Sequence, residues 1–404
     1  MDPIDAECPN WLSKRIEEEK GSISFFQFME WSLNDPEYGA YATGRLSIGK
    51  HGDFVTSPSL GSEFSDLLAV QVIDWLNQLG EFCDKSQSFS LIDIGPGEGD
   101  LSKGLINSIE KLAPLLLSKI ELILVEVNQG MIDRQKRNLE NIKSVPIRWS
   151  SLSDLERKPS IGIVIANELL DAMPVERIVF RNGDLYRQGI SILKKDQNSY
   201  LNFVELPLSV QLINSIDSFT SSNNIKIPPF GVVDGWTTEW HIGLNAWFKK
   251  VSKILSIGSL LIIDYALEAY RYYSEKRSSG TLMAYRNNTA STNILYQPGY
   301  WDLTSHLCLE TLIDSAKNNG LIFLGDLRQG EALLALGLSQ KLYSLNSLSI
   351  ENLAIAFERR ETLLRLVDPH CLGDFRWIAF QFNNQNTIVK ANNIQLSTRF
   401  LQEP

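Results

Sequence analysis

Short apolar runs alternate with amphipathic segments through the middle of the chain. Ser90–Ile94 has the composition of a buried strand, and Leu101, Leu105 and Ile109 then recur at helical spacing. Further strands are expected at 120–127, 145–149 and 161–166, with a helix at 131–141 between the first two. This βαβαβ succession predicts an α/β fold with a mostly parallel, doubly wound sheet.

Helical patterns occupy much of the first 80 residues, at 11–21, from Ile23 onward, and at 64–79. Between them, 49–58 is dense in Gly, Ser and Thr and cannot bury a core, so it is expected to be a loop. This loop is either a surface connector or a flap over a ligand whose polar contacts are Asp53, Thr56 and Ser57. We therefore divide the chain into a helical N-terminal segment with a cofactor-covering loop, 1–80, and a main domain, 81–404.

The main domain is expected to carry α/β insertions at about 175–250 and 266–310. Two alternating runs around Asn182-Gly183 predict a β-hairpin in the first of them. Trp236, Trp240 and Trp247 follow at helix-like spacing, which is typical of a core or interface stripe. Strands at 259–265, 321–324 and 375–382 and a long helical region at 330–366 are expected to complete the sheet and its cover.

Composition narrows the possible partners. The 404 residues are 44% hydrophobic, as in a globular protein with a sizeable core, and no apolar run reaches the ~18 residues of a membrane span. A net charge of -10 argues against nucleic acid as a partner, because basic surface has to supply that affinity. The polar, acidic stretch Met1–Lys20 lacks the features of a signal or transit peptide, and we expect a cytoplasmic, bacterial-type protein. The oligomeric state stays open.

The four cysteines are far apart in the sequence and form no C-x-x-C pair. They are Cys8, Cys83, Cys308 and Cys371. No histidine lies at metal-ligand spacing from them, so we expect free thiols in a reducing compartment and no metal site.

A glycine-rich loop follows the strand at 90–94 and opens the next helix. Asp93, Gly95, Pro96, Gly97 and Gly99 form it, and alternate glycines let a ligand approach the backbone closely. The sequence lacks the Gly-Lys-Ser/Thr of a P-loop and the third glycine of a dinucleotide fingerprint. Acidic side chains at the helix start disfavour a pyrophosphate and suit a zwitterionic ligand with a cationic centre. The spacing resembles motif I of S-adenosyl-L-methionine (SAM) dependent methyltransferases.

Two further motifs fall at the ends of predicted strands. Glu126, followed by Val127, is placed to accept hydrogen bonds from both ribose hydroxyls of such a cofactor. Asn167, Glu168 and Asp171 follow the strand at 161–166, where they would face the transferred methyl group. Their carboxylates could hold a guanidinium group by bidentate hydrogen bonds, and we favour this role over the alternative that Glu168 and Asp171 cap the next helix.

One histidine in the second insertion is a further candidate. His306 could serve as a base or as a hydrogen-bonding anchor, and a purely structural role is about as well supported.

Taken together, these blocks resemble the MidA family of SAM-dependent methyltransferases, whose mitochondrial members are assembly factors for respiratory complex I. The matching blocks are Gly52–Pro58, Asp93–Gly99, Val125–Val127, Ala166–Pro174, Ile262–Tyr265, Gly280–Leu282 with Ala284–Arg286, and Asp302–His306. The resemblance implies a Rossmann-like class I methyltransferase core with insertions, SAM as cofactor, and an arginine of a large hydrophilic NADH dehydrogenase subunit as acceptor.

The chain departs from the family pattern at Ser59, Ala266, Met283 and Cys308. Three of these lie in or beside the second insertion, so they bear on the acceptor more than on the cofactor. Two alternatives stay open at this point: a methyltransferase acting on a small molecule, and an assembly factor that binds SAM without essential catalysis.

Overall fold

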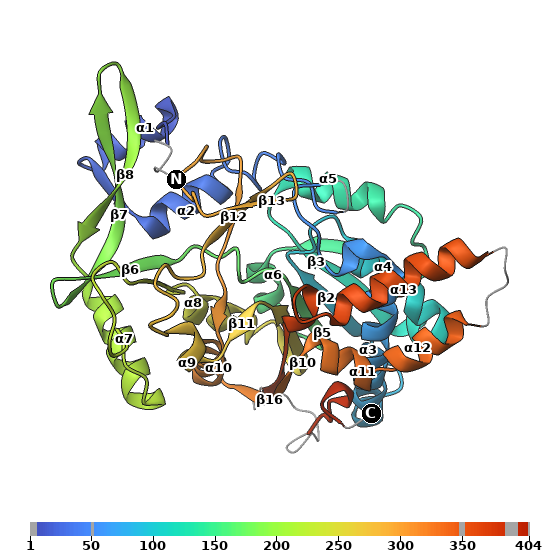
Figure 1. Cartoon of the computed structure of the whole chain (residues 1–404). Helices are drawn as coiled ribbons and strands as arrows, with labels where there is room; N and C mark the ends of the chain where they lie inside the picture. Colours follow the sequence, from blue (N-terminus) through green and yellow to red (C-terminus); the bar gives the residue numbers. More distant parts are fainter. Residues whose placement is uncertain (1–5, 50–51, 347–351, 384–394, 403–404) are drawn as a thin grey trace.

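A seven-stranded sheet forms the centre of the computed structural model, which describes residues 6–49, 52–346, 352–383 and 395–402 (Figure 1). The strand order is β16-β17-β10-β5-β2-β3-β4. Neighbours from β10 to β4 are parallel, whereas β17 is antiparallel to both of its neighbours. The strands are β2 (Phe89–Ile94), β3 (Ile120–Val125), β4 (Ile147–Ser150), β5 (Ser160–Asn167), β10 (Leu255–Asp264), β16 (Leu321–Arg328) and β17 (Arg376–Asn383).

Helices cover both faces of this sheet because its inner strands are apolar on both sides; β2, for example, is buried along its whole length. One face packs against α3 (Ser62–Phe82), α4 (Asp100–Leu112), α11 (Gln329–Ala335), α12 (Leu338–Leu345) and α13 (Leu353–Val367). The other packs against α6 (Leu152–Arg157), α8 (Leu244–Val251) and α10 (Leu309–Asn318). The predicted doubly wound α/β fold is confirmed.

A second, five-stranded sheet is built mainly from the first insertion. Its order is β1-β7-β6-β9, with β8 paired to β7, and β1 is contributed by the N-terminal segment. The strands are β1 (Ser22–Ser24), β6 (Glu176–Arg181), β7 (Asp184–Lys195), β8 (Asn198–Leu206) and β9 (Thr237–Trp240). The hairpin predicted around Asn182-Gly183 is the β6–β7 turn. Helix α7 (Val210–Asn223) packs beside it.

The N-terminal segment and the second insertion share a hydrophobic core with the β7–β8 hairpin. This core contains the buried faces of α1 (Asn10–Glu18) and α2 (Phe25–Asn34). The second insertion supplies α9 (Ala269–Tyr272) and short strands: β11 (Ala266–Leu267), β12 (Met283–Arg286), β13 (Thr289–Ser291), β14 (Asp302–Thr304) and β15 (Leu307–Cys308). Because α3 packs on the central sheet while β1 joins the sheet of the first insertion, residues before 80 contact both the central sheet and that insertion. The domain boundary at residue 80 stays a prediction.

One local prediction is wrong. The tryptophan stripe does not lie on one helix, since Trp236 precedes β9, Trp240 ends it and Trp247 belongs to α8. Trp236 and Trp240 are nevertheless core residues, as expected. The helical region expected at 330–366 consists of α11, α12 and α13. Its residues 347–351 lie outside the described part, as do Lys50 and His51 of the predicted loop.

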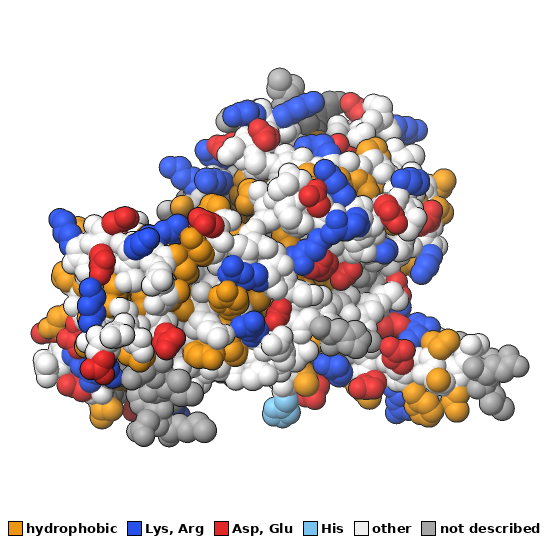
Figure 2. Space-filling model, turned by 90° about the horizontal axis from the view of Figure 1, so that it is seen from above, with side chains coloured by type: hydrophobic (Ala, Val, Ile, Leu, Met, Phe, Trp, Pro, Cys, Tyr) orange, Lys and Arg blue, Asp and Glu red, His pale blue; other side chains and the backbone are white. Residues whose placement is uncertain are grey.

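The outer surface mixes acidic and basic side chains, as Figure 2 shows from above. Hydrophobic side chains gather at the edge where α12 and α13 lie; the exposed ones there are Tyr343, Leu353, Ile355 and Phe357. Within the described ranges, no helix has the length and apolar character needed to cross a bilayer. All four cysteines are unpaired.

Candidate functional site

A cavity of about 830 Å³ opens where β2, β3 and β5 end. Carboxyl ends of parallel strands meet at one edge of a sheet, which brings the three predicted motifs together there. The predicted site residues that line the cavity are Thr56, Asp93, Gly95, Pro96, Gly97, Glu126, Val127, Asn167 and Glu168. Gly99, Asp53, Ser57, Asp171 and His306 are not part of the lining.

The glycine loop between β2 and α4 adopts a backbone that only glycine accepts easily. Gly95 has φ of +68° and Gly97 has φ of +54°. A Cβ at Gly95 would lie 2.5 Å from Leu169 Cδ1, and one at Gly97 would lie 2.9 Å from Ile48 Cδ1. Both glycines therefore let Leu169 and Ile48 of the cavity wall pack directly against the loop backbone. Gly99, with φ of +86°, precedes α4 as its N-cap.

Asp93 lies beneath this loop. Its carboxylate accepts a hydrogen bond of 2.7 Å from Ser102 Oγ, and burial raises the pKa of Asp93 to about 6.

Glu126 is fixed by its own turn and by α5 (Gln129–Asn138). Its Oε1 accepts from the backbone N–H groups of Val127 and Asn128, at 2.8 and 2.9 Å. Gln135 Nε2 donates to Glu126 Oε2 at 3.3 Å and to the Gly97 carbonyl at 2.9 Å. The amide of Gln135 thus joins the glycine loop to the carboxylate expected to bind ribose.

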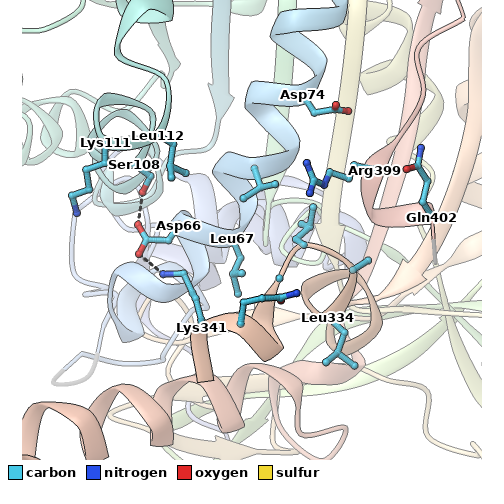
Figure 3. A pocket seen from close by; sticks show the side chains of 15 residues that line it. Asp66, Leu67, Asp74, Ser108, Lys111, Leu112, Leu334, Lys341, Arg399 and Gln402 are labelled. Atoms are coloured by element: carbon cyan, nitrogen blue, oxygen red, sulfur yellow. Dashed lines mark hydrogen bonds and ion pairs between the residues drawn. The ribbon is translucent and has the colours of Figure 1, made fainter. Parts of the chain in front are cut away.

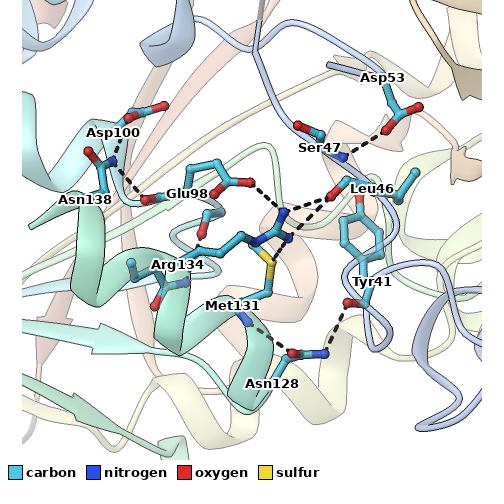
Figure 4. Close-up of polar contacts among 12 residues, drawn as sticks. Tyr41, Leu46, Ser47, Asp53, Glu98, Asp100, Asn128, Met131, Arg134 and Asn138 are labelled. Carbon is cyan, nitrogen blue, oxygen red and sulfur yellow. Dashed lines mark hydrogen bonds and ion pairs between the residues drawn. The ribbon is translucent and has the colours of Figure 1, made fainter. Parts of the chain in front are cut away.

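The N-terminal segment is tied to the same edge of the sheet (Figure 4). Asn128 caps α5 by accepting from Met131 N, and its Nδ2 donates to the carbonyls of Tyr41 and Ala42. Arg134 forms an ion pair of 3.1 Å with Glu98 and donates to the Leu46 carbonyl. Residues 41–46 are therefore held over the loop that follows β2.

Glu168 has a strained backbone directly after β5. Its φ is +50°, an uncommon value for a residue other than glycine. Its Oε1 accepts 3.1 Å hydrogen bonds from Ser57 N and Asn167 Nδ2, and no described residue donates to Oε2. Burial, more than any neighbour, raises the pKa of Glu168 to about 8. Such strain is typical of functional sites.

Three further carboxyl groups are buried behind Glu168. Asp264 ends β10 and accepts from the backbone N–H groups of Leu170, Asp171 and Tyr265, which fixes the turn after β5. Burial raises the pKa values of Asp264 and Asp302 to about 7. Burial, followed by Asp264, Asp302 and Glu168, also raises the pKa of Asp171. A cation would relieve this concentration of carboxyl groups.

The remaining predicted residues have other contacts. Asp53 accepts from Ser47 N at 2.8 Å and Asn287 N at 3.0 Å, so it ties its loop to the turn after β12. Ser57 Oγ faces Gln329 in the interior, while its backbone N–H reaches Glu168.

His306 stacks on Tyr265 with 5.3 Å between ring centroids. Burial lowers the pKa of His306 to about 4, so the ring is neutral near pH 7.

Sequence reasoning missed Tyr41, Asn128, Gln135, Asp264 and Asp302 as site residues. Asp264 and Asp302 stand in the matching blocks 262–265 and 302–306 of the MidA resemblance, and Asp264 lies at the end of a predicted strand, so its position could have suggested it. Tyr41 and Gln135 carry no comparable signal, because their placement depends on tertiary contacts.

A second cavity of about 710 Å³ lies between α3, α4 and α12 (Figure 3). Lys341 pairs there with Glu63 and Asp66, and Ser108 donates to Asp66. Of its lining residues, Asp66 and Lys341 pair with one another, and none of the predicted site residues lines it.

The first cavity suits SAM. Gly95 and Gly97 stand where a Cβ would collide with lining side chains, the lining is acidic, and Asn167 Oδ1 is buried without a hydrogen-bond partner among the described residues. That oxygen can accept from an amino group of a ligand. No group of three metal-ligating side chains is found in the described ranges.

Comparison with known proteins agrees with this assignment. "Protein arginine methyltransferase NDUFAF7, mitochondrial" of Bos taurus is 25% identical over 347 residues, covering 80% of this chain and 71% of that protein. The Danio rerio protein of the same name is 24% identical over 405 residues, covering 94% and 87%.

A crystal structure of a COG1565 superfamily member from Burkholderia thailandensis, bound to S-adenosyl-homocysteine, has the same fold. Its TM-score is 0.78 at 24% identity, and the match covers 94% of this chain and 92% of that one. Residues 67–326 match the family model described as "Putative S-adenosyl-L-methionine-dependent methyltransferase". The chain therefore belongs to this family of SAM-dependent methyltransferases, the MidA family, and its cofactor is SAM.

Proposed function

We propose that this methyltransferase modifies an arginine side chain of a protein. The observation that carries the proposal is a group of buried carboxyls, in which Glu168 lines the cofactor cavity and Asp171, Asp264 and Asp302 lie behind it. A positively charged, planar guanidinium compensates such a group and accepts bidentate pairing. The arginine methyltransferases named above are distant relatives that support the same acceptor.

SAM supplies an electrophilic methyl group on a sulfonium. The protein's task is then to hold the cofactor and the acceptor nitrogen in line. We assign the backbone of Gly95 and Gly97 to close contact with the cofactor. Asp93 and the carboxylate of Glu126 are assigned to hydrogen bonds with its polar groups. Thr56, Pro96 and Val127 complete the lining of the cavity. We propose that Asn167 Oδ1 accepts a hydrogen bond from an amino group of the cofactor or of the acceptor.

Glu168 is assigned the central role toward the acceptor. Its Oε1 is already fixed by Ser57 N and Asn167 Nδ2, which leaves Oε2 to pair with the guanidinium. A guanidinium beside it favours the ionised form, despite a pKa of about 8 in the free protein. Oε2 can then receive the proton that the methylated nitrogen loses. We assign Asp171, which is buried behind Glu168, to stabilising the same cation. His306 and Asp53 are assigned supporting roles.

We further propose a protein partner, such as a large hydrophilic NADH dehydrogenase subunit, and a cytoplasmic location. The unpaired cysteines suit a reducing compartment. Cell fractionation followed by immunoblotting tests the location; recovery in a membrane or secreted fraction would contradict it.

The acceptor class is tested by adding the protein and SAM carrying an isotopically labelled methyl group to lysate of the source cell. The lysate is separated into macromolecular and small-molecule fractions, and labelled protein is hydrolysed for amino-acid analysis. Label in methylarginine supports the proposal. Label confined to small molecules would refute it and favour a small-molecule methyltransferase.

A further inference from the structure

Tyr41 is brought to the cavity from outside the part of the chain that matches the family model, 67–326. Its position is set by backbone contacts: Tyr41 N donates to the Leu33 carbonyl at 3.0 Å, and the Tyr41 carbonyl accepts from Asn128 Nδ2 at 3.1 Å. Figure 4 shows the ring beside the loop that carries Leu46. Tyr41 is thus anchored both to the end of α2 and to the start of α5.

The phenol of Tyr41 reaches the buried carboxyl groups. Its hydroxyl donates to Asp302 Oδ1 at 2.8 Å. Burial, followed by Asp302, Asp171 and Glu168, raises the pKa of Tyr41, so the phenol is neutral. With its proton directed at Asp302, the hydroxyl oxygen offers lone pairs to a donor in the cavity.

Selection of a guanidinium over an ammonium needs more than carboxylates. Carboxylates attract either cation, whereas a guanidinium presents five N–H donors in one plane and a flat face. The Tyr41 hydroxyl can accept from either cation, but the flat ring that its hydrogen bond to Asp302 holds in place can stack on a planar guanidinium, which an ammonium does not offer.

We propose that Tyr41 binds the acceptor and selects arginine over lysine, and that Asp302 positions the Tyr41 hydroxyl. This inference rests on the proposed function and adds the residue that discriminates the acceptor. It assigns specificity to the N-terminal segment, whereas the family-matched core holds the cofactor.

The test uses the full chain saturated with S-adenosylhomocysteine. N-acetyl-L-arginine N-methylamide and the corresponding lysine compound are the probes, and binding is measured by NMR titration. The variant Tyr41→Phe keeps the ring and removes the hydroxyl. Tyr38→Phe is the matched control, because Tyr38 donates its hydroxyl to Glu37 at the surface and does not line the cavity.

We expect Tyr41→Phe to weaken binding of the arginine probe ~10- to 100-fold, the range for a hydrogen bond to a charged group. Binding of S-adenosylhomocysteine should be unchanged, which also shows that the variant is folded, and the lysine probe should lose less affinity than the arginine probe. Asp302→Asn removes a carboxylate that attracts either cation and also releases the Tyr41 hydroxyl, so it should weaken binding of the arginine probe more than binding of the lysine probe.

Equal binding of the arginine probe by Tyr41→Phe and the wild type would overturn the inference and leave the proposed function standing. Failure of the wild type to bind the arginine probe, together with label in no protein arginine of the lysate, would overturn both. If Tyr41→Phe does not fold, Asp302→Asn decides alone: an equal loss of affinity for the two probes would overturn the inference.

Discussion

Gln135 links the two cofactor-binding motifs, and removing its amide should weaken both the fold and the cofactor site. The side chain is fully buried. It donates to Gly97 O and Glu126 Oε2 and accepts from Trp149 Nε1 at 2.8 Å. The substitution Gln135→Met keeps the length and volume of the side chain but can make none of these hydrogen bonds.

The expected cost follows from what each partner loses. Gly97 and Glu126 line the cavity and can be rehydrated, whereas Trp149 does not line it. A buried donor left without a partner costs ~1–3 kcal/mol, and each ordinary hydrogen bond contributes ~1 kcal/mol, so we expect a total loss of about 2–4 kcal/mol. Because the amide also fixes Glu126, affinity for S-adenosylhomocysteine should fall about tenfold.

Urea unfolding of the ligand-free protein measures the loss of stability, and isothermal titration calorimetry measures the affinity for S-adenosylhomocysteine. Gln211→Met is the control, because Gln211 is exposed on α7 and distant in the chain from the site; it should change the unfolding free energy by less than ~0.5 kcal/mol. If the two variants were equally stable and bound S-adenosylhomocysteine equally, the assigned role of Gln135 would be refuted.

Two further predictions concern the loop and the buried carboxyls. Gly95→Ala adds a Cβ 2.5 Å from Leu169 Cδ1 at φ of +68°, and should reduce the affinity for SAM, measured by calorimetry, at least ~10-fold. The control Gly183→Ala, at φ of +91° with no atom within 4 Å of its Cβ, should bind SAM normally. Equal affinities of the two variants for SAM would contradict the expectation. Glu168 titrates at about 8 when folded and near 4.5 when unfolded, so the folded state binds more protons between these values and stability should fall as pH rises through that window. Glu168→Gln should reduce this loss of stability between pH 5 and pH 9 by more than ~1 kcal/mol, as measured by urea unfolding at both pH values. An equal loss in the variant and the wild type would show that Glu168 is not the titrating group.

Much of the central fold could be predicted because apolar strands and amphipathic helices alternate in it. The strand before Gly95 and the strand before Asn167 were placed within one or two residues. The tryptophan stripe was misassigned because a short strand and a short helix in succession happened to mimic helical spacing. Only tertiary packing separates these two elements.

The candidate site could be predicted mainly where its residues follow strand ends, although Thr56, predicted from its Gly/Ser/Thr-rich loop, also lines the cavity. Glu126 and Glu168 satisfy that rule, and both line the cavity. Tyr41 and Asp302 are far apart in the chain and meet only through tertiary folding, so no spacing rule relates them. Asp53 lies in the expected loop, yet its carboxylate is used by backbone N–H groups of Ser47 and Asn287.

The most direct test of the account is transfer of labelled methyl from SAM to protein by three forms of the chain, with the modified residue located by tandem mass spectrometry. The forms are the wild type, Glu168→Gln, and Glu110→Gln as a control on the exposed surface of α4. We predict labelled arginine with the wild type and the control, and a loss of at least ~100-fold with Glu168→Gln, although that variant still binds SAM. Undiminished arginine labelling by Glu168→Gln, or label on another residue type, would contradict the account.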